Sequence, residues 1–347
     1  MRALRVPKLE AENARQYLEK IAAVERSVRM PEIGGSVEIP LSRGLTAAEK
    51  KKVASFGGKV VALAKARPRK VRVPPYDSIV GKLELPKKAK ALLPDKWEML
   101  GDVLVLKLDK ELEPWLRDIA KAYALELRAK TVLREVAPIS GQYREPTMEK
   151  LWGGGTVALH VENGIKYKLD AAKLMFSSGN MDERLRMAGV SNPGEVVVDM
   201  FAGIGYFTLP IAKYSKPKMV RAYEINPLSH RYLVENIGIN GLSNVEPHLG
   251  DCAEAEEGVA DRVIMGYVGT THLYLRKAMR ILRGEGVIHY HETCPCALLP
   301  GRPKARVADA AKKEGRKVEV VRLKEVKSYA PGVSHVVLDV RVRPGST

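Results

Sequence analysis

A glycine turn between two predicted strands constrains the fold of this chain more than any other feature. The sequence VVVDMFAGIGYF (residues 196–207) is an apolar run that ends at Asp199 and is followed by Gly203 and Gly205. The next predicted strand ends in an acid, Glu224, which lies 21 residues beyond Gly203. In a parallel sheet, glycines at the first strand-to-helix turn let the backbone approach a nucleoside. An acid at the tip of the second strand can bind both ribose hydroxyls.

The turn favours a nucleoside ligand without phosphates. It lacks the third glycine of the dinucleotide fingerprint, so no pyrophosphate cradle is predicted. Adenosine fits better, and S-adenosylmethionine (SAM) is the commonest cofactor of that kind. Asp199, Gly203 and Gly205 are predicted to contact this cofactor. Asp251 ends the third predicted strand, where it can reach the adenine amine, while the N–H of Cys252 can meet a ring nitrogen. The alternative interpretation of Asp251 is a cap of the helix that follows.

Strands and helices alternate from about residue 176 onward. The alternation predicts an α/β fold, a doubly wound sheet that ends in an antiparallel ribbon. The predicted strands are residues 196–200, 219–224, 245–249, 262–265 and 286–291, followed by the ribbon at 318–326 and 334–343.

Two smaller α/β modules are predicted before this sheet. The first combines a helix-spaced segment, with Ala14 and Leu18 on one face, and strand-like residues 36–41 and 58–64. A proline-broken basic segment, residues 67–75, is predicted to be a linker. The predicted domains are residues 1–72, 76–175 and 176–347.

The middle module is predicted from three segments. Residues 103–108 read as a buried strand and residues around 114–129 as a helix. Residues 154–170 form a predicted hairpin whose turn is Glu162-Asn163-Gly164.

Charge is distributed unevenly along the chain. The formal net charge is +17, and residues 1–100 hold 22 Lys and Arg against 11 Asp and Glu. Between Glu49 and Asp77 there is no acid. That interval holds nine basic residues, which are Lys50, Lys51, Lys52, Lys59, Lys65, Arg67, Arg69, Lys70 and Arg72. A bias on this scale favours nucleic acid as a partner over a surface that is basic only for solubility.

The cysteine content indicates whether a metal site is expected, and the hydropathy pattern indicates where the protein is expected to be located. The three cysteines, Cys252, Cys294 and Cys296, are typical of a reducing compartment and do not complete a four-ligand metal site. No apolar run reaches 18 residues and no signal-peptide core is present, so a cytoplasmic protein without a membrane partner is expected.

The segment FSSGNMDER, residues 176–184, precedes the first strand of the sheet. Arg184 can pair with a carboxylate, and SAM carries one on its methionine moiety. The alternative is structural, because Asn180 and Glu183 have the spacing of a capping box. The residues alone do not decide between these interpretations.

Two segments at the ends of the fourth and fifth strands complete the predicted cleft. MGYVGTTH, residues 265–272, stands where base-methylating enzymes often carry an Asn- or Asp-Pro-Pro clamp or a related Asn-Leu-Pro. In HYHE, alternation puts His289 and His291 on one face and Tyr290 on the other. One histidine is therefore expected against a neighbour and one near the cleft mouth. His291 is a candidate general base, with structural support of the loop as the alternative role.

Several of these segments together resemble a known family. DMFAGIGYFTLPIA, YEINP, LVENIGING, DRVIMGYVGTTH, GVIHYHE and YAPGVSHVVLDVRV resemble the archaeal-type aminocarboxypropyltransferases of wyosine biosynthesis. These belong with the tRNA guanine-37 N1-methyltransferases in one class I SAM-dependent superfamily. The resemblance spans residues 76–345, and the first 70 residues resemble the N-terminal domain of the methyltransferases. It implies that Ser177, Arg184, Glu224, Asp251 and Cys252 bind SAM.

The resemblance also implies a reaction. The expected activity is transfer of the 3-amino-3-carboxypropyl group to the tricyclic base 4-demethylwyosine at position 37 of tRNA(Phe), with release of methylthioadenosine. Tyr267 and Arg144 are the expected contacts with the tRNA substrate, and no protein partner is implied. Two alternatives remain, a tRNA guanine-37 N1-methyltransferase and a non-catalytic tRNA-binding protein.

Overall fold

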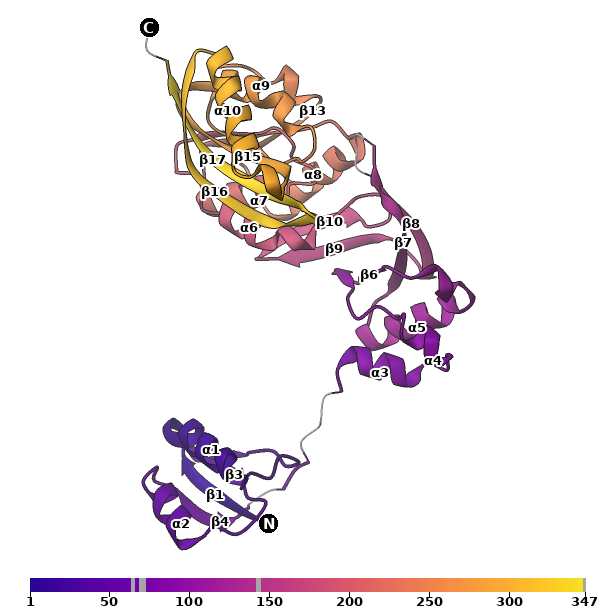
Figure 1. The fold of residues 1–347 in the computed structure, drawn as a ribbon, viewed down its shortest axis with the longest axis vertical. Helices are drawn as coiled ribbons and strands as arrows, with labels where there is room; N and C mark the ends of the chain where they lie inside the picture. The colour runs from indigo at the N-terminus through magenta and orange to yellow at the C-terminus, as the bar shows by residue number, and fades with distance from the viewer. Residues whose placement is uncertain (64–65, 69–72, 142–144, 346–347) are drawn as a thin grey trace. The chain divides into compact units, whose positions relative to one another are not determined.

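The computed structural model describes residues 1–63, 66–68, 73–141 and 145–345 (Figure 1). The chain divides into two compact units, Met1–Asp77 and Ser78–Thr347, and each has a hydrophobic core of its own. This division draws no boundary near residue 175. The separation of a middle domain from a C-terminal domain therefore stays a prediction.

The first unit is a four-stranded antiparallel sheet in the order β2-β3-β1-β4, with helices packed on it. Its elements are β1 (Arg2–Pro7), α1 (Ala11–Lys20), β2 (Glu32–Ile33), β3 (Ser36–Pro40), α2 (Ala47–Ala54) and β4 (Lys59–Ala62). Ala14 and Leu18 are buried on α1, which confirms the helix predicted from their spacing. At α2 the side chains of Thr46 and Glu49 form a capping box, which fixes where the helix begins.

The second unit begins with a four-stranded sheet in the order β5-β6-β7-β8. Its elements are α3 (Pro75–Lys82), α4 (Lys87–Lys90), β5 (Glu98–Leu100), β6 (Val103–Leu106), α5 (Leu116–Leu127), β7 (Thr131–Ser140) and β8 (Glu145–Gly153). The predicted strand and helix of this region are confirmed as β6 and α5. α5 begins two residues after Pro114, which lies in the preceding 3₁₀ turn.

A hairpin, β9 (Val157–Glu162) and β10 (Ile165–Asp170), leads to the large sheet. The predicted turn was Glu162-Asn163-Gly164; Glu162 is the last residue of β9, and Asn163 and Gly164 form the turn with φ of +49° and +74°. The side chain of Asn236 accepts from the backbone N–H of Lys168 and donates to its carbonyl at 2.7 and 3.1 Å. These bonds fix the hairpin to a helix of the large sheet.

The C-terminal part of the second unit is a seven-stranded sheet in the order β13-β12-β11-β14-β15-β17-β16. Its strands are β11 (Val196–Asp199), β12 (Met219–Glu224), β13 (Val245–Leu249), β14 (Ala260–Met265), β15 (Leu282–Pro295), β16 (Arg316–Ala330) and β17 (Val333–Pro344). The strands from β13 to β15 are parallel, whereas β17 lies antiparallel to both β15 and β16. The predicted fold class, a doubly wound α/β sheet with a terminal antiparallel ribbon, is confirmed.

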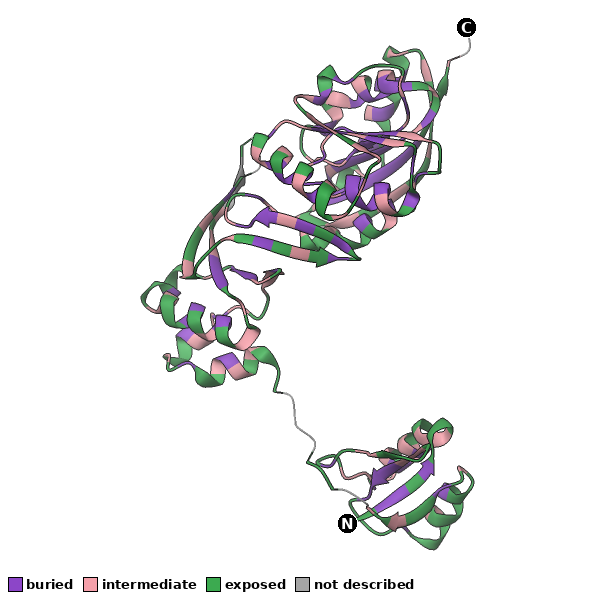
Figure 2. Cartoon of the chain, turned by 180° about the vertical axis from the view of Figure 1, so that it is seen from behind, coloured by how far each residue is buried: buried purple, intermediate pink, exposed green. Residues whose placement is uncertain are grey.

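Helices cover both faces of this sheet, because the strands are apolar on both sides. Val197 packs with Met187 and Phe207 on one face, while its neighbour Val198 packs with Val307 on the other. The first face carries α6 (Met181–Met187), α7 (Thr208–Pro210) and α8 (Pro227–Ile239), and the second carries α9 (Leu275–Ile281) and α10 (Gly301–Lys313). Figure 2 shows the central strands of the sheet largely buried and the outer helix surfaces exposed, while the edge strands β13 and β16 have no buried residue.

Candidate active site

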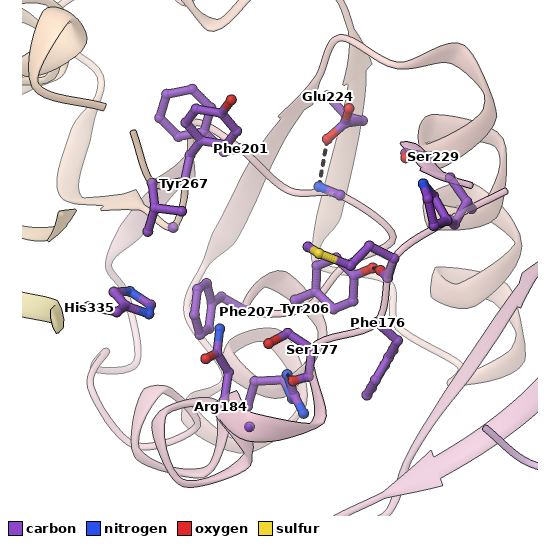
Figure 3. Close-up of a pocket in the computed structure, with 18 of the residues that line it drawn as sticks. Phe176, Ser177, Arg184, Phe201, Tyr206, Phe207, Glu224, Ser229, Tyr267 and His335 are labelled. Atoms are coloured by element: carbon purple, nitrogen blue, oxygen red, sulfur yellow. Dashed lines mark hydrogen bonds between the residues drawn. The ribbon is translucent and has the colours of Figure 1, made fainter. Parts of the chain in front are cut away.

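A cavity of about 1020 Å³ opens where the parallel strands end (Figure 3). The carboxyl ends of β11, β12, β13 and β14 contribute to its wall, as do residues 174–184 and the ribbon of β16 and β17. The predicted site residues that line it are Ser177, Arg184, Gly203, Glu224, Asp251, Cys252 and Tyr267. Asp199, Gly205 and His291 are not among the lining residues, and Arg144 lies outside the described residues.

Glu224 links the two strand ends of the predicted nucleoside site. Its Oε2 accepts from the backbone N–H of Gly203 at 2.7 Å, and its Oε1 accepts from that of Asn226 at 2.8 Å. Burial raises the pKa of Glu224, and these backbone bonds oppose the rise. Each carboxylate oxygen has a second lone pair, so the acid can still accept two ribose hydroxyls.

The two glycines of the turn have different roles. Gly203 lines the cavity with φ of +57°, and a Cβ there would lie 2.5 Å from the ring of Tyr206. Gly205 has φ of +103°, and its Cβ would lie 2.5 Å from Leu209. Gly203 therefore leaves room for the Tyr206 ring at the cavity wall, whereas Gly205 allows the following helix to pack.

Asp199 supports the turn from below. Its Oδ2 accepts from the Thr208 hydroxyl at 2.7 Å and its Oδ1 from the backbone N–H of Phe201 at 3.2 Å. The side chain is fully buried, and burial raises the pKa of Asp199 to about 6. The predicted cofactor contact of Asp199 thus has no support in the geometry.

Asp251 caps a turn and also faces the cavity, so the capping role does not exclude the predicted ligand contact. Its Oδ1 accepts from the backbone N–H of Ala253 at 2.8 Å and caps a short 3₁₀ turn, and the residue also lines the cavity. Cys252 is buried beside it, where burial raises the pKa of the thiol. Because the thiol is neutral, the polar groups of Cys252 that a ligand can contact are those of its backbone.

Arg184 is held by a partner that the sequence did not reveal. Its guanidinium makes a bidentate pair with Glu162 of β9, at 2.6 Å for both bonds, and donates to the Ser177 carbonyl at 2.7 Å. Asn180 makes no side-chain cap of α6, and Glu183 pairs with Arg186 at 2.6 Å. The capping interpretation is therefore wrong, because Asn180 makes no capping bond and Glu183 pairs with Arg186 instead.

Lys327 of β16 is a cavity residue that sequence reasoning missed. Its Nζ donates to the Ser177 hydroxyl at 2.7 Å. It brings a second cation to the end of the cavity lined by Ser177 and Arg184. No local pattern marks it, because Lys327 is one of several basic residues on the ribbon and only the strand register selects it.

An aromatic wall lies at the end of β14. The ring of Tyr267 stacks on Phe201 with centroids 5.3 Å apart and an interplanar angle of 28°. The ring of Phe207 lies so close to Gly266 that a Cβ there would be 2.6 Å from it. Figure 3 shows Tyr267 and Phe207 at the same side of the cavity as His335 of β17.

The histidines of HYHE are both buried. His289 hydrogen-bonds Asp339 at 2.6 Å and Arg262 at 2.8 Å, and His291 faces His335 at 3.0 Å. The expectation of one histidine near the cleft mouth is corrected, because covering helix α6 buries both rings and His335 occupies the cavity wall instead.

No group of metal-ligating side chains occurs within the described residues. In that same part of the chain, no helix combines the length and apolar character needed to span a bilayer. Sheet order, glycine turn, acid at the second strand and cavity together define a class I SAM-dependent enzyme fold.

Family models match most of the second unit. The TRM5/TYW2 methyltransferase domain matches residues 158–321, and the TYW2 N-terminal domain matches residues 69–156. The chain is 48% identical over 261 residues to the tRNA(Phe) (4-demethylwyosine(37)-C(7)) aminocarboxypropyltransferase of Pyrococcus horikoshii, covering 75% of this chain and 93% of that protein. The enzyme of that name from Methanocaldococcus jannaschii is also 48% identical, with coverage of 71% and 97%. The chain belongs to the TRM5/TYW2 family.

One relative differs in how much of the chain it spans. The tRNA (guanine(37)-N(1))-methyltransferase Trm5b of Pyrococcus abyssi is 33% identical and covers 98% of both chains. Its crystal structure has a TM-score of 0.75 at 32% identity, covering 99% of each chain. The structure of P. horikoshii TYW2 in complex with MeSAdo has a TM-score of 0.70 at 46% identity, covering 77% of this chain and 98% of that one. The chain is thus more similar in sequence to the two aminocarboxypropyltransferases than to Trm5b. The alignment with Trm5b, however, covers nearly the whole chain.

Proposed function

We propose that this protein transfers the 3-amino-3-carboxypropyl group of SAM to carbon 7 of 4-demethylwyosine at position 37 of tRNA(Phe), with release of methylthioadenosine. The observation that carries the proposal is the 48% identity to two aminocarboxypropyltransferases over 93% and 97% of their lengths. The cavity supports it, since seven of the residues predicted for the site line one continuous space.

The residues of the cavity fit SAM from one end to the other. In this proposal Glu224 accepts the ribose hydroxyls, and Asp251 with the backbone of Cys252 binds adenine; that all three line the cavity supports these roles. A side chain at Gly203 would enter the ring of Tyr206, so the position of this ring in the cavity wall depends on glycine. When bound, SAM supplies an electrophilic carbon next to its sulfonium.

At the opposite end of the cavity lie residues that can orient the methionine moiety and so select which carbon of SAM reacts. Lys327 and the Ser177 hydroxyl form a polar corner that suits the carboxylate of the methionine moiety, while Arg184, whose charge is paired with Glu162, holds the Ser177 carbonyl. Holding that carboxylate fixes which carbon faces the base, and orientation of this kind decides the product. Tyr267, on the aromatic wall, is placed to stack on the base.

The first unit is proposed to contact the tRNA backbone. Lys50, Lys51 and Lys52 are exposed on α2. Lys59 and Arg67, which follow α2 in the chain, are also exposed. Phosphate contacts by such residues contribute affinity without sequence selection. Lys65, Arg69, Lys70 and Arg72 of the same basic interval lie outside the described residues. The domain limits proposed for this arrangement are 1–72, 76–175 and 176–347.

The test follows two labels through one reaction. The full chain is incubated with tRNA(Phe) bearing 4-demethylwyosine and SAM labelled either in its carboxyl carbon or in its methyl group. Carboxyl label should move to RNA, and methyl label should leave with methylthioadenosine. Methyl label in RNA would overturn the proposal in favour of methylation.

A guanine-37 N1-methyltransferase is the second candidate, because Trm5b matches the chain across its whole length, including the first unit. It is tested with tRNA that carries unmodified guanine at position 37 and methyl-labelled SAM. Label in that RNA would support it. The absence of SAM binding in calorimetry would instead favour a tRNA-binding protein without catalysis.

A further inference from the structure

Glu98 of β5 brings a negative charge to the wall of the cavity. It lines this space together with Ser177, Ser178 and Lys327. Its Oε1 accepts from the backbone N–H of Ser178 at 3.3 Å, and within the described residues Glu98 makes no ion pair. Burial raises the pKa of Glu98, and its hydrogen bonds with Ser178 oppose the rise only in part. A carboxylate that burial disfavours and that no neighbouring cation pairs with is suited to a cationic ligand.

Glu98 and Lys327 reach the same short segment of backbone from two different strands. Lys327 of β16 donates to the Ser177 hydroxyl at 2.7 Å, while Glu98 of β5 accepts from the next residue, Ser178. An amino acid carries its carboxylate and its ammonium group on the same carbon. A cation and an acid that contact adjacent residues of one segment therefore match the two charges of the methionine moiety.

Two backbone carbonyls at this end of the cavity are already in use. The carbonyl of Ser177 accepts from Arg184 at 2.7 Å, and that of Met175 accepts from the hydroxyl of Tyr206. Figure 3 shows Ser177 next to Arg184, away from Glu224. A neutral carbonyl with one lone pair in use is a weaker partner for an ammonium group than a carboxylate is.

Among the described residues, three other acids line the cavity, and each has another place. Glu135 pairs with Lys107 at 3.2 Å. Glu224 and Asp251 lie at the proposed ribose and adenine contacts, where they accept from the backbone of the turns that follow β12 and β13. Glu98 is therefore the acid that is left for a cationic group at the methionine end.

We infer that Glu98 binds the α-ammonium group of the methionine moiety of SAM, next to the carboxylate that Lys327 and the Ser177 hydroxyl bind. The inference rests on the proposed function, because it takes SAM as the ligand and its methionine chain as the group that is transferred. A carboxylate has about four lone-pair positions, so Glu98 can accept from an ammonium group while it keeps its bond to Ser178. With both charged groups of one carbon held, the chain has little freedom to turn, and this decides which carbon next to the sulfonium faces the base.

Glu98 then holds the group that is transferred and not the group that leaves. In the proposed reaction the ammonium and carboxylate groups move to RNA with the γ carbon, whereas methyl transfer would leave both on S-adenosylhomocysteine. Loss of the contact should therefore weaken the binding of any ligand that carries the ammonium group, and it should leave the binding of the nucleoside unchanged.

The test measures, by calorimetry on the full chain without RNA, the affinity for four ligands that differ at the α carbon. SAM carries both charged groups, decarboxylated SAM keeps only the ammonium, a deaminated SAM analogue keeps only the carboxylate, and methylthioadenosine has neither. Glu98→Gln keeps the shape of the side chain and removes its charge. The variant should bind SAM and decarboxylated SAM about 10- to 100-fold more weakly, the effect of one charged hydrogen bond. Its affinity for the other two ligands should not fall.

Two further variants separate this contact from its neighbours. Lys327→Met should weaken the binding of SAM and of the deaminated analogue but not that of decarboxylated SAM, which is the opposite pattern. Glu135→Gln removes one negative charge from the same cavity wall, where Glu135 is paired with Lys107, and should leave all four affinities unchanged.

Three other outcomes for Glu98→Gln would overturn the inference. An equal loss of affinity for all four ligands would make Glu98 a structural residue. An equal loss for SAM and the deaminated analogue would assign Glu98 to the sulfonium, which these two share. Unchanged SAM affinity with weaker binding of tRNA would assign it to the base. If the wild type transfers carboxyl label to RNA, such a result overturns the inference alone, whereas methyl label in RNA overturns the proposed function and the ligand pattern still decides the contact.

Discussion

The half of the cavity that suits a nucleoside and the half that is closed by the terminal ribbon are built by different means. The first half comes from one continuous stretch, in which Gly203, Glu224 and Asp251 each end a strand or begin a turn. The second half joins Ser177 before the sheet to Lys327 and His335 after it. A nucleoside site can therefore be shared by enzymes that differ in chemistry, because the ribbon half can change without disturbing it.

The largest expected effect of a single substitution falls in the nucleoside half. Glu224→Ala removes the acceptor for two ribose hydroxyls, and each charge-assisted bond contributes about 1.5–3 kcal/mol. It also leaves the N–H groups of Gly203 and Asn226 without their partner. SAM affinity measured by calorimetry should fall severely, and tRNA affinity should hardly change. Glu224→Gln, which keeps the shape, should lose less; unchanged SAM affinity in the Ala variant would remove Glu224 from the site.

A smaller and more selective effect is expected in the ribbon half. Lys327→Met keeps the aliphatic stem and removes the cation, so SAM should bind more weakly by about 1.5–3 kcal/mol, the contribution of a charged hydrogen bond. Methylthioadenosine lacks the carboxylate and should bind as before. Lys324→Met, on the same strand but outside the cavity wall, is the matched control. An equal drop in affinity for both ligands would show that Lys327 acts on the fold of the site instead.

The basic first unit should affect tRNA alone. Replacing Lys50, Lys51 and Lys52 by Gln should weaken tRNA binding and reduce the slope of log affinity against log salt by about one for each phosphate that the variant no longer neutralises. SAM affinity should not change. The triple Arg variant keeps the charge and should behave like the wild type. A slope that does not differ between the Gln and Arg variants would mean that these lysines do not bind RNA.

The smallest effect is expected for Asp199→Asn, and it concerns stability rather than ligand binding. Burial raises the pKa of Asp199 from 3.8 to about 6, so the folded state favours the neutral acid and loses stability as pH rises through this window. Asn carries no charge, so the free energy of unfolding of the variant should rise relative to that of the wild type as the pH goes from about 4 to 6. Above about pH 6 the difference between the two proteins should stay constant. Urea titrations across this range measure it. Parallel stability curves would contradict the assignment.

The sequence predicts site residues well where each of them lies at the end of a strand that is itself recognisable in the sequence. The glycine turn, Glu224 and Asp251 were predicted because each is coupled to a strand end that apolar runs reveal. His335 and Lys327 were missed because they become neighbours only through the register of β16 and β17, which no short pattern specifies. One histidine of HYHE was expected near the cleft mouth, and this was wrong because alternation assigns a face to a side chain but does not show what covers that face.

Partnerships between distant residues were out of reach for the same reason. Arg184 and Glu162 lie on different elements, α6 and β9, and their pairing depends on how the hairpin packs. The capping interpretation of Asn180 and Glu183 failed because local spacing offered one partner and the fold supplied a better one in Arg186. Tertiary packing decides which partner such a side chain takes, and the spacing of residues along the chain does not reveal that packing.

The insertion of β17 between β15 and β16 has a consequence for biosynthesis. During translation the nucleoside half can be assembled once the chain has passed β14, but β17 is the last described strand to leave the ribosome. Until it arrives, β15 and β16 have no partner between them and the cavity has no far wall. A nascent chain would thus be able to capture SAM before it could use it, and catalytic competence would appear in one late step.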